Sequence, residues 1–364
     1  MLYNINNCQE QKFFVIWDQA RMDIDDIKNM EEFAHIVGIS RPTISKYFND
    51  AESVRQTTRL KIEEALKKYN YRPNIYAINQ NRKLTKNIGI IVPFLADPFF
   101  AEIARFIERR ILSLGFTPSL FSAHGDPEIE KTILDTLRSL RPAGVLLAPL
   151  GRASDKRYIK DFCRDVPTIL FDSNIEGMGE AFVGSDNYSF VSQTVEYLSR
   201  TGTPPTFFEM RNPANPNANK RRNSYIAMME KLELEANFIQ VDGNGWAFEE
   251  IGRAGALEIL KQDALPTNTI LCSNDRLAIG FLSACHKLGI QVGRDENSEI
   301  RVASHDDHPY SKFTCPSLTT AAHDYESVAS YAVETLFKLI EEGGHLKNRE
   351  EKLFSARLIM RDSA

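Results

Sequence analysis

The chain of 364 residues lacks the features that mark several classes of protein. No stretch reaches the roughly 18 uncharged apolar residues that a membrane-spanning helix needs. The apolar run Phe13–Trp17 ends at Asp18 and follows no basic segment, so a signal peptide is not expected. The five cysteines are widely scattered and form no C-x-x-C pair, which argues against a disulfide framework or zinc site and indicates a cytoplasmic protein.

Motifs of common enzymes are missing as well. The chain contains no G-x-x-x-x-G-K-[ST] phosphate loop, no G-x-S-x-G nucleophile turn and no H-E-x-x-H metal pair. We therefore expect no enzyme, and neither a cofactor nor a bound metal ion. A soluble sugar-binding protein or a sugar-acting enzyme without DNA function is the alternative, because carboxylates in an α/β fold can serve either purpose.

The charge of the chain, −5 in total, is unevenly distributed. Residues 27–86 contain 12 Lys and Arg against 6 Asp and Glu, a net charge of +6. Residues 1–26 carry −3 and residues 87–364 carry −8. A small basic segment on a large acidic body indicates one module that binds a polyanion, and the length predicts two or three domains.

The basic segment has the pattern of a helix-turn-helix unit. Apolar residues recur at helical spacing over 29–37, Gly38 suits a tight turn, and Ser40 is a strong N-cap for a second helix over 41–49. Helical hairpins without a DNA role share this spacing. In the DNA-binding unit the second helix lies in the major groove. Its side chains able to bond to bases or phosphates are Ser40, Arg41, Thr43, Ser45, Lys46 and Asn49.

From residue 88 onward, short apolar runs of strand length alternate with segments of helical period. This alternation predicts an α/β fold with doubly wound parallel sheets in two lobes. Ligands of such folds bind beyond the carboxyl ends of the strands, here in the cleft between the lobes. The strands are expected at 88–93, 117–122, 144–149, 168–171, 206–210, 237–241, 269–272 and 300–303.

Several motifs resemble the lactose/galactose-repressor (LacI/GalR) family. They are Ser40–Asn49, Tyr69–Asn74, Gly184–Asn187, Ser273–Gly280 and Pro316–Thr320. The resemblance spans about residues 27–363 and implies a three-helix headpiece, a hinge helix and a body like a periplasmic sugar-binding protein. It divides the chain into an N-terminal extension unlike the family (1–26), a helix-turn-helix headpiece (27–73), a hinge or linker (74–86) and a two-lobed effector-binding and dimerisation domain (87–363).

The resemblance implies a transcriptional repressor that binds a pseudo-palindromic operator as a homodimer. Its effector, a carbohydrate-like small molecule, binds between the lobes and changes operator affinity. In the hinge, which enters the minor groove, the implied DNA contacts are Asn74, Ala77 and Gln80. Family members usually carry a leucine wedge where Gln80 stands, and an amide unstacks bases less well than an apolar side chain.

The first candidate effector residues stand where predicted strands end. Asp97, Phe99 and Phe100 follow the first strand, so the rings are placed to stack on a sugar while the carboxylate accepts hydrogen bonds from hydroxyls. Asp172 ends the fourth strand and Asp275 ends a strand of the second lobe, and both align with carboxylates that bind hydroxyls in sugar-binding relatives. A helix cap is the rival role for an aspartate in such a position.

Further candidates rest on the resemblance. Arg221, with Arg222 as the alternative, matches an arginine that contacts the ligand from the second lobe. Trp246 lies near the position of a stacking aromatic, and Arg152 and His305 are weaker candidates. The turn-rich insert 212–219 is placed to form a lid over the cleft. Sugar-binding members often have arginine after the Asp172 position, where this chain has serine, so the sugar pattern is incomplete.

Overall fold

The computed structural model describes residues 27, 29–73, 85–343 and 348–364. They form two compact units, one ending at Thr85 and one beginning at Lys86. The extension 1–26 and the predicted hinge contacts Asn74, Ala77 and Gln80 lie outside the described residues. None of the described helices is long and apolar enough to cross a membrane.

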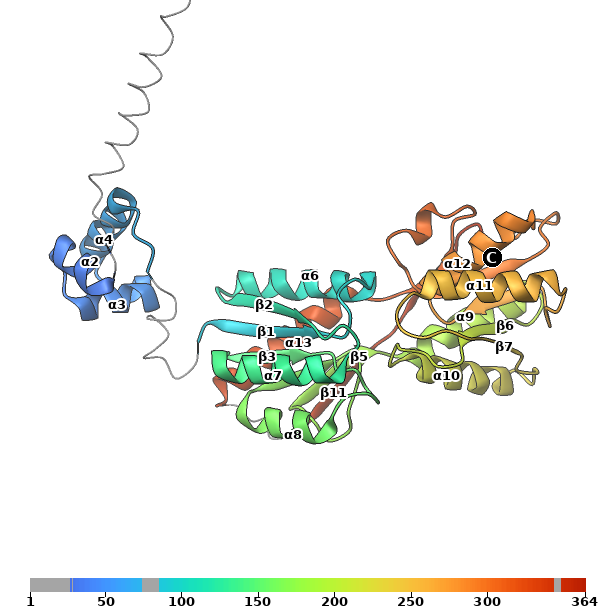
Figure 1. The fold of residues 1–364 in the computed structure, drawn as a ribbon, viewed down its shortest axis with the longest axis horizontal. Coiled ribbons are helices and arrows are strands. Elements are labelled where there is room, and N and C mark those ends of the chain that lie inside the picture. The colour runs from blue at the N-terminus through green and yellow to red at the C-terminus, as the bar shows by residue number, and fades with distance from the viewer. Residues whose placement is uncertain (1–26, 28, 74–84, 344–347) are drawn as a thin grey trace, which may run out of the picture. The chain divides into compact units, whose positions relative to one another are not determined.

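The described part of the first unit contains three helices, α2 (Met30–Val37), α3 (Arg41–Asn49) and α4 (Gln56–Tyr69), with a short 3-10 turn, η1 (Ala51–Ser53), before α4 (Figure 1). Gly38 ends α2 in the left-handed conformation, φ 67°, which glycine adopts without a steric penalty. The turn between α2 and α3 therefore forms as predicted. Ser40 is the N-cap residue of α3, as predicted, but it does not make the expected capping bond. Its hydroxyl bonds to the Thr43 hydroxyl and not to the helix backbone.

One fully buried side chain from each helix builds the core of this unit. Phe33, Ile44 and Ile62 have no exposed surface, and Tyr71 stacks on Phe33 with ring centroids 4.5 Å apart. This apolar centre is small, so each of its members contributes a large share of the stability of the headpiece.

The second unit begins with a lobe built on a six-stranded, wholly parallel sheet of order β11-β5-β4-β3-β1-β2. Its strands are β1 (Asn87–Val92), β2 (Thr117–Ser122), β3 (Gly144–Leu147), β4 (Thr168–Phe171), β5 (Ala181–Ser185) and β11 (Glu350–Phe354). Its helices are α6 (Pro98–Ser113), α7 (Pro127–Leu140), α8 (Lys156–Asp165) and α13 (Tyr325–Glu341). Helices α6 and α13 cover one face and α7 and α8 the other.

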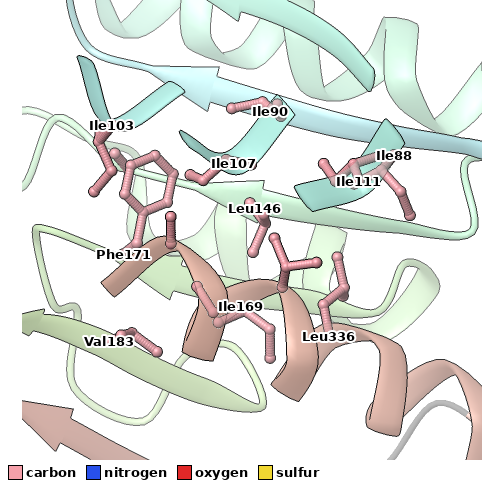
Figure 2. Close-up of a cluster of buried hydrophobic side chains, with 14 of the residues drawn as sticks. Ile88, Ile90, Ile103, Ile107, Ile111, Leu146, Ile169, Phe171, Val183 and Leu336 are labelled. Carbon is pink, nitrogen blue, oxygen red and sulfur yellow. The ribbon is translucent and has the colours of Figure 1, made fainter. Parts of the chain in front are cut away.

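Buried aliphatic side chains from both layers fill the space under α6 and α13. Figure 2 shows Ile88 and Ile90 of β1 facing Ile107 and Ile111 of α6, with Leu336 of α13 closing the cluster. Apolar residues on both faces of β1 explain why its sequence reads as one continuous apolar run.

The second lobe repeats this architecture with the sheet order β12-β10-β9-β8-β6-β7, in which β12 runs antiparallel to β10. Its strands are β6 (Thr206–Met210), β7 (Phe238–Val241), β8 (Thr269–Cys272), β9 (Arg301–Asp306), β10 (Thr319–Ala322) and β12 (Arg357–Ile359). Helices α9 (Asn187–Thr201) and α10 (Ala218–Lys231) cover one face, and α11 (Phe248–Lys261) and α12 (Asp275–Leu288) cover the other. A 3-10 turn, η2 (Ser311–Phe313), follows β9.

The expected two-lobed α/β fold is confirmed, with corrections in detail. The chain passes between the lobes three times, after β5, after β10 and after β11. The predicted strand over 144–149 ends at Leu147, and the one over 300–303 continues to Asp306. The structure adds β5, β10, β11 and β12, which were not predicted as strands. Strand β11 is mostly charged and β12 has three residues, so neither shows an apolar run.

Candidate DNA-binding and effector sites

The headpiece gathers predicted DNA contacts on one face of α3. Arg41, Ser45, Lys46 and Asn49 line an open hollow of about 410 Å³. Their spacing places them on neighbouring turns of the helix, while Ile44 points into the core. The arrangement offers two cations and two short polar side chains to a surface outside the domain, which is what recognition of base edges and phosphates needs.

The remaining predicted contacts sit at the start of the same helix. Ser40 and Thr43 share a hydroxyl–hydroxyl hydrogen bond of 2.8 Å. Arg41 forms an ion pair with Glu31, with 3.5 Å between Nε and the carboxylate, and both side chains are more than half exposed. Exposed pairs of this kind contribute at most about 1 kcal/mol, so Arg41 can exchange Glu31 for a phosphate at little cost.

A cleft in the body brings side chains of both lobes together. Its described lining consists of Asp97, Phe99, Phe100, Asp172, Asn215, Asn217, Arg221, Trp246, Asn274, Arg276 and Asp306. The space inside measures about 20 Å³. That volume holds about one water molecule, far less than the 300 Å³ or more of an ordinary ligand site. The lobes are therefore closed on each other, and a ligand enters only when they move apart.

Several contacts join the lobes across this cleft. Arg276 of α12 donates from Nη1 to Oδ2 of Asp97 at 3.1 Å. The amide of Asn217 donates to the carboxylate of Asp172 at 2.8 Å and to its carbonyl at 3.2 Å. The ring of Trp246 stacks on Phe94, with centroids 5.1 Å apart and planes 12° from parallel. An ion pair, an amide bridge and an aromatic stack thus hold the closed arrangement.

The deepest part of the cleft is a charged network around Asp306. Arg221, which is 3% exposed, donates to the Asp306 carboxylate and to the backbone carbonyl of Ser273. His323 bridges Asp306, 3.1 Å from its Nε2, and the Ser185 hydroxyl, 2.7 Å from its Nδ1. Burial opposes ionisation of Asp306, but Arg221 and His323 outweigh it and lower the pKa of Asp306 to about 2. Asp306 is therefore a permanent anion.

Asp172 behaves differently. Burial raises its pKa to about 6, with Lys220 and Arg221 only partly offsetting the cost of desolvation. The backbone angle φ is +59° at Asp172 and +117° at Asp306. Residues other than glycine rarely adopt positive φ. Both strained aspartates line the cleft, and backbone strain of this kind clusters at binding sites.

The structure brings six of the predicted effector residues together in this cleft: Asp97, Phe99, Phe100, Asp172, Arg221 and Trp246. Asp97 is also the N-cap of α6, accepting from the amide of Phe99 at 3.0 Å. Arg222, the alternative to Arg221, instead pairs with Glu209 of β6 at 3.3 Å and is not among the lining residues.

Asp275 is not brought to the cleft lining. Its carboxylate has no exposed surface and accepts from the amide of His308 at 2.8 Å and from the hydroxyls of Ser311 and Thr320. The cap of α12 is Asn274, so Asp275 is not the cap either. It fixes the segment after β9 against α12. Burial and repulsion from Asp306 raise the pKa of Asp275 to about 7.

Two weaker candidates also lie elsewhere. Arg152 lines a second cavity between the lobes, separate from the cleft. His305 is fully buried, and neither ring nitrogen has a hydrogen-bond partner within the described part of the chain. Burial, reinforced by Arg221, lowers the pKa of His305 to about 3, so the ring is neutral.

Five lining residues were not predicted from the sequence: Asn215, Asn217, Asn274, Arg276 and Asp306. Asp306 ends β9 and Asn274 follows β8 by two residues, so the strand-end rule that selected Asp172 applies to them equally. Asn215 and Asn217 belong to the insert expected to form a lid, and both do reach the cleft. No local signal points to Arg276, because its role depends on the opposite lobe.

A helix-turn-helix headpiece joined to a two-lobed α/β body with an interlobe cleft defines a DNA-binding regulator that responds to a ligand. Comparisons with known proteins agree. Residues 29–74 match the model of bacterial regulatory proteins of the lacI family, and residues 196–364 match the periplasmic binding protein-like domain. The chain therefore combines a DNA-binding region of the lacI-family type with a periplasmic-binding-protein-like domain.

Relatives include the HTH-type transcriptional repressor PurR of Histophilus somni strain 129Pt, 27% identical over 315 residues, which cover 86% of this chain and 93% of that protein. The ribose operon repressor of Escherichia coli K12 is 25% identical with the same coverage. Among solved structures, the lac repressor dimer bound to operator and an anti-inducer superposes with a TM-score of 0.78 at 23% identity, over 92% of this chain and 98% of that one.

A second solved structure is a regulator from Alkaliphilus metalliredigens complexed with D-xylulofuranose. It has a TM-score of 0.64 and 25% identity, covering 77% of this chain and 99% of that one. These relatives are repressors and regulators, and the chain is a transcriptional regulator that binds DNA through its headpiece.

Proposed function

We propose that this regulator is a cytoplasmic repressor whose affinity for its operator is set by a neutral polyhydroxylated ligand bound between the lobes. The observation that carries the ligand class is the lining of the cleft. Hydrogen-bonding aspartates and asparagines alternate there with the rings of Phe99, Phe100 and Trp246. Rings that stack on an apolar sugar face beside acceptors for its hydroxyls are what a carbohydrate or nucleoside requires. The relative complexed with D-xylulofuranose supports the same class.

The charges of the cleft argue for a neutral ligand. Arg221 is neutralised by Asp306, and Arg276 by Asp97 and Glu249, so neither guanidinium is left to pair with an anionic ligand. Asp172 remains as the carboxylate without a paired arginine. Its Asn217 partner belongs to the second lobe, so a ligand hydroxyl that replaces Asn217 separates the lobes there.

The ligand acts by shifting the equilibrium between the closed and the open arrangement of the lobes. A ligand shifts the equilibrium between closed and open bodies only by the difference in its affinity for the two. We place the coupling to the headpiece in residues 74–86, with Asn74, Ala77 and Gln80 as minor-groove contacts. The domains are then 27–73 for the headpiece, 74–86 for the hinge and 87–363 for the body.

We propose that the regulator is a homodimer that reads two half-sites of a pseudo-palindrome. Two exposed aromatic side chains beside η2 suit a contact between copies. Tyr310 is 66% exposed and Phe313 is 71% exposed. Burial of both rings between two copies would remove apolar surface from water, which stabilises association. Replacing both with serine is expected to yield monomers in analytical ultracentrifugation, while the wild-type chain sediments as a dimer.

Binding of the full chain to a library of DNA sequences at several salt concentrations tests the function. We expect selection of a palindrome, with affinity that falls steeply as salt increases, because phosphate contacts release counterions. Arg41→Ala and Lys46→Ala are expected to weaken DNA binding and leave sugar binding unchanged. Absence of any palindrome preference, or equal loss of DNA and sugar binding in these variants, contradicts the proposal.

A further inference from the structure

The body has a second cavity between the lobes, distinct from the effector cleft. It measures about 270 Å³ and is open to solvent. One wall is formed by the loops after β3 and β4, with Arg152 and Ser173, and by the start of α8, with Lys156. The other wall is the first two turns of α10, with Lys220 and Asn223. Because the walls belong to different lobes, an occupant contacts both lobes at once.

The charge of this cavity is opposite to that of the cleft. Arg152, Lys156 and Lys220 line it against a single carboxylate, Glu176. None of the three cations forms an ion pair with a carboxylate of the described residues. By contrast, each arginine of the cleft has a carboxylate partner. An excess of unpaired cations in a concave site attracts anions.

The carboxylates near Lys220 are occupied elsewhere. Desolvation lowers the pKa of Lys220, and the through-space attraction of Asp172 and Glu351 offsets this only in part. Asp172 accepts from Asn217, and Glu351 accepts from Arg349 and Asn174. Lys220 is an exposed residue without a direct carboxylate partner among the described residues, so its charge is available to an anionic ligand in the cavity.

An unused hydrogen-bond donor lies in the same wall. Ser173 lines the cavity, and its residue is 3% exposed. Its hydroxyl forms no hydrogen bond with the described parts of the chain, so it is free to donate to an anion bound in the cavity. The start of α10 adds backbone donors, because the side chain of its N-cap residue, Asn217, bonds to Asp172 and leaves the first turn uncapped.

We propose that this cavity binds the phosphate group of a small phosphorylated metabolite, held by Arg152, Lys156, Lys220 and the Ser173 hydroxyl. Its volume is close to the lower end for small-molecule sites, about 300 Å³, and leaves room for a small organic remainder beside the phosphate. Since both walls contribute, the anion stabilises the closed lobes. The regulator then has two ligand sites of opposite charge, separated by the Asp172–Asn217 bridge, and closure responds to both.

Isothermal titration of the full chain without DNA tests this site, with inorganic phosphate, glucose 6-phosphate and glucose as probes at constant ionic strength. We expect both phosphate-bearing probes to bind to the wild-type chain. Arg152→Ala combined with Lys220→Ala is expected to weaken their binding at least tenfold, and Ser173→Ala several-fold. The control Lys160→Ala removes an exposed cation of α8 outside the cavity and is expected to change nothing.

Two results overturn the proposal. One is failure of inorganic phosphate and glucose 6-phosphate to bind to the wild-type chain. The other is equal affinity of the double variant and the control for both probes. Neither result depends on DNA binding or on a ligand in the effector cleft, so failure of this site and failure of the proposed repressor function are distinguishable. Circular dichroism of each variant identifies any loss of fold.

Discussion

The ion pair between Asp97 and Arg276 is expected to control closure of the lobes. Both side chains are nearly buried, 12% and 13% exposed, and their nearest nitrogen and oxygen are 3.1 Å apart. Asp97→Asn removes the charge but keeps an acceptor for the amide of Phe99, since asparagine caps helices as well as aspartate does. Helix α6 should therefore remain intact, and the substitution should weaken only the contact between the lobes.

The magnitude follows from the contacts of Arg276. Its other partner, Glu249, lies in the same lobe and accepts two hydrogen bonds of 2.7 Å, so the guanidinium stays neutralised in the variant. What is lost is one hydrogen bond between charged groups, about 1.5–3 kcal/mol. Because about 1.4 kcal/mol corresponds to a tenfold change in an equilibrium constant, the closed-to-open ratio is expected to fall roughly 10- to 100-fold.

Tryptophan fluorescence measures this change directly. The chain has two tryptophans, and Trp17→Phe leaves Trp246, which stacks on Phe94 of the opposite lobe, as the single reporter. In that background Asp97→Asn is expected to increase quenching of Trp246 by acrylamide, because opening exposes the ring. Glu249→Gln is the matched control, since it removes one carboxylate from the same arginine within one lobe. Equal quenching in the two variants would refute the role of the ion pair.

Three further outcomes are expected. Ile44→Ala should lower the free energy of unfolding of the headpiece by about 2–5 kcal/mol, which is enough to unfold so small a core. A DNA titration should then show that binding is lost. Scanning calorimetry should show that the melting transition of the body is unchanged. Lys46→Ala should lower the slope of log affinity against log salt by about one unit in a DNA titration, whereas a structural role would leave the slope unchanged. The folded pKa of Asp172, about 6, lies above the ordinary 3.8, so its contribution to stability is full below pH 4 and is lost, by about 3 kcal/mol, as pH rises to about 6. Asp172→Asn should remove that part of the pH profile of unfolding, and an unaltered profile would contradict the pKa.

Local patterns were sufficient to predict most of the fold. The turn at Gly38 and the buried strand β1 depend on the backbone freedom of one residue and on apolar runs, which the sequence displays directly. Strands β11 and β12 could not be predicted in this way. They are short or charged edge elements that exist because partners distant in the sequence, β5 and β10, offer free strand edges.

The candidate site was predictable where a residue's position in its own lobe decides its role. Asp172 turns toward the cleft because the chain adopts a positive φ directly after β4. Asp275 was expected to end a strand, but β8 stops three residues earlier, at Cys272. Asn274 takes the cap position, and Asp275 enters the helix, where its carboxylate accepts from the amide of His308. Because the cap is Asn274 and not Asp275, the Asp275 carboxylate holds the segment after β9 and does not reach the cleft. No rule based on residue spacing detects a shift of one residue in the cap position.

The pairing of charges between elements distant in the sequence was beyond sequence reasoning, and it determines what each cavity can bind. Arg221 was predicted as an effector contact and Arg152 as a weaker candidate for the same site. In the structure Arg221 is matched by Asp306, so its cleft favours neutral hydroxyl-bearing molecules. Arg152 shares its cavity with Lys156 and has no carboxylate partner among the described residues, so its charge is available to an anion. The ligand preference of each site therefore depends less on which cations line it than on which of them are already neutralised.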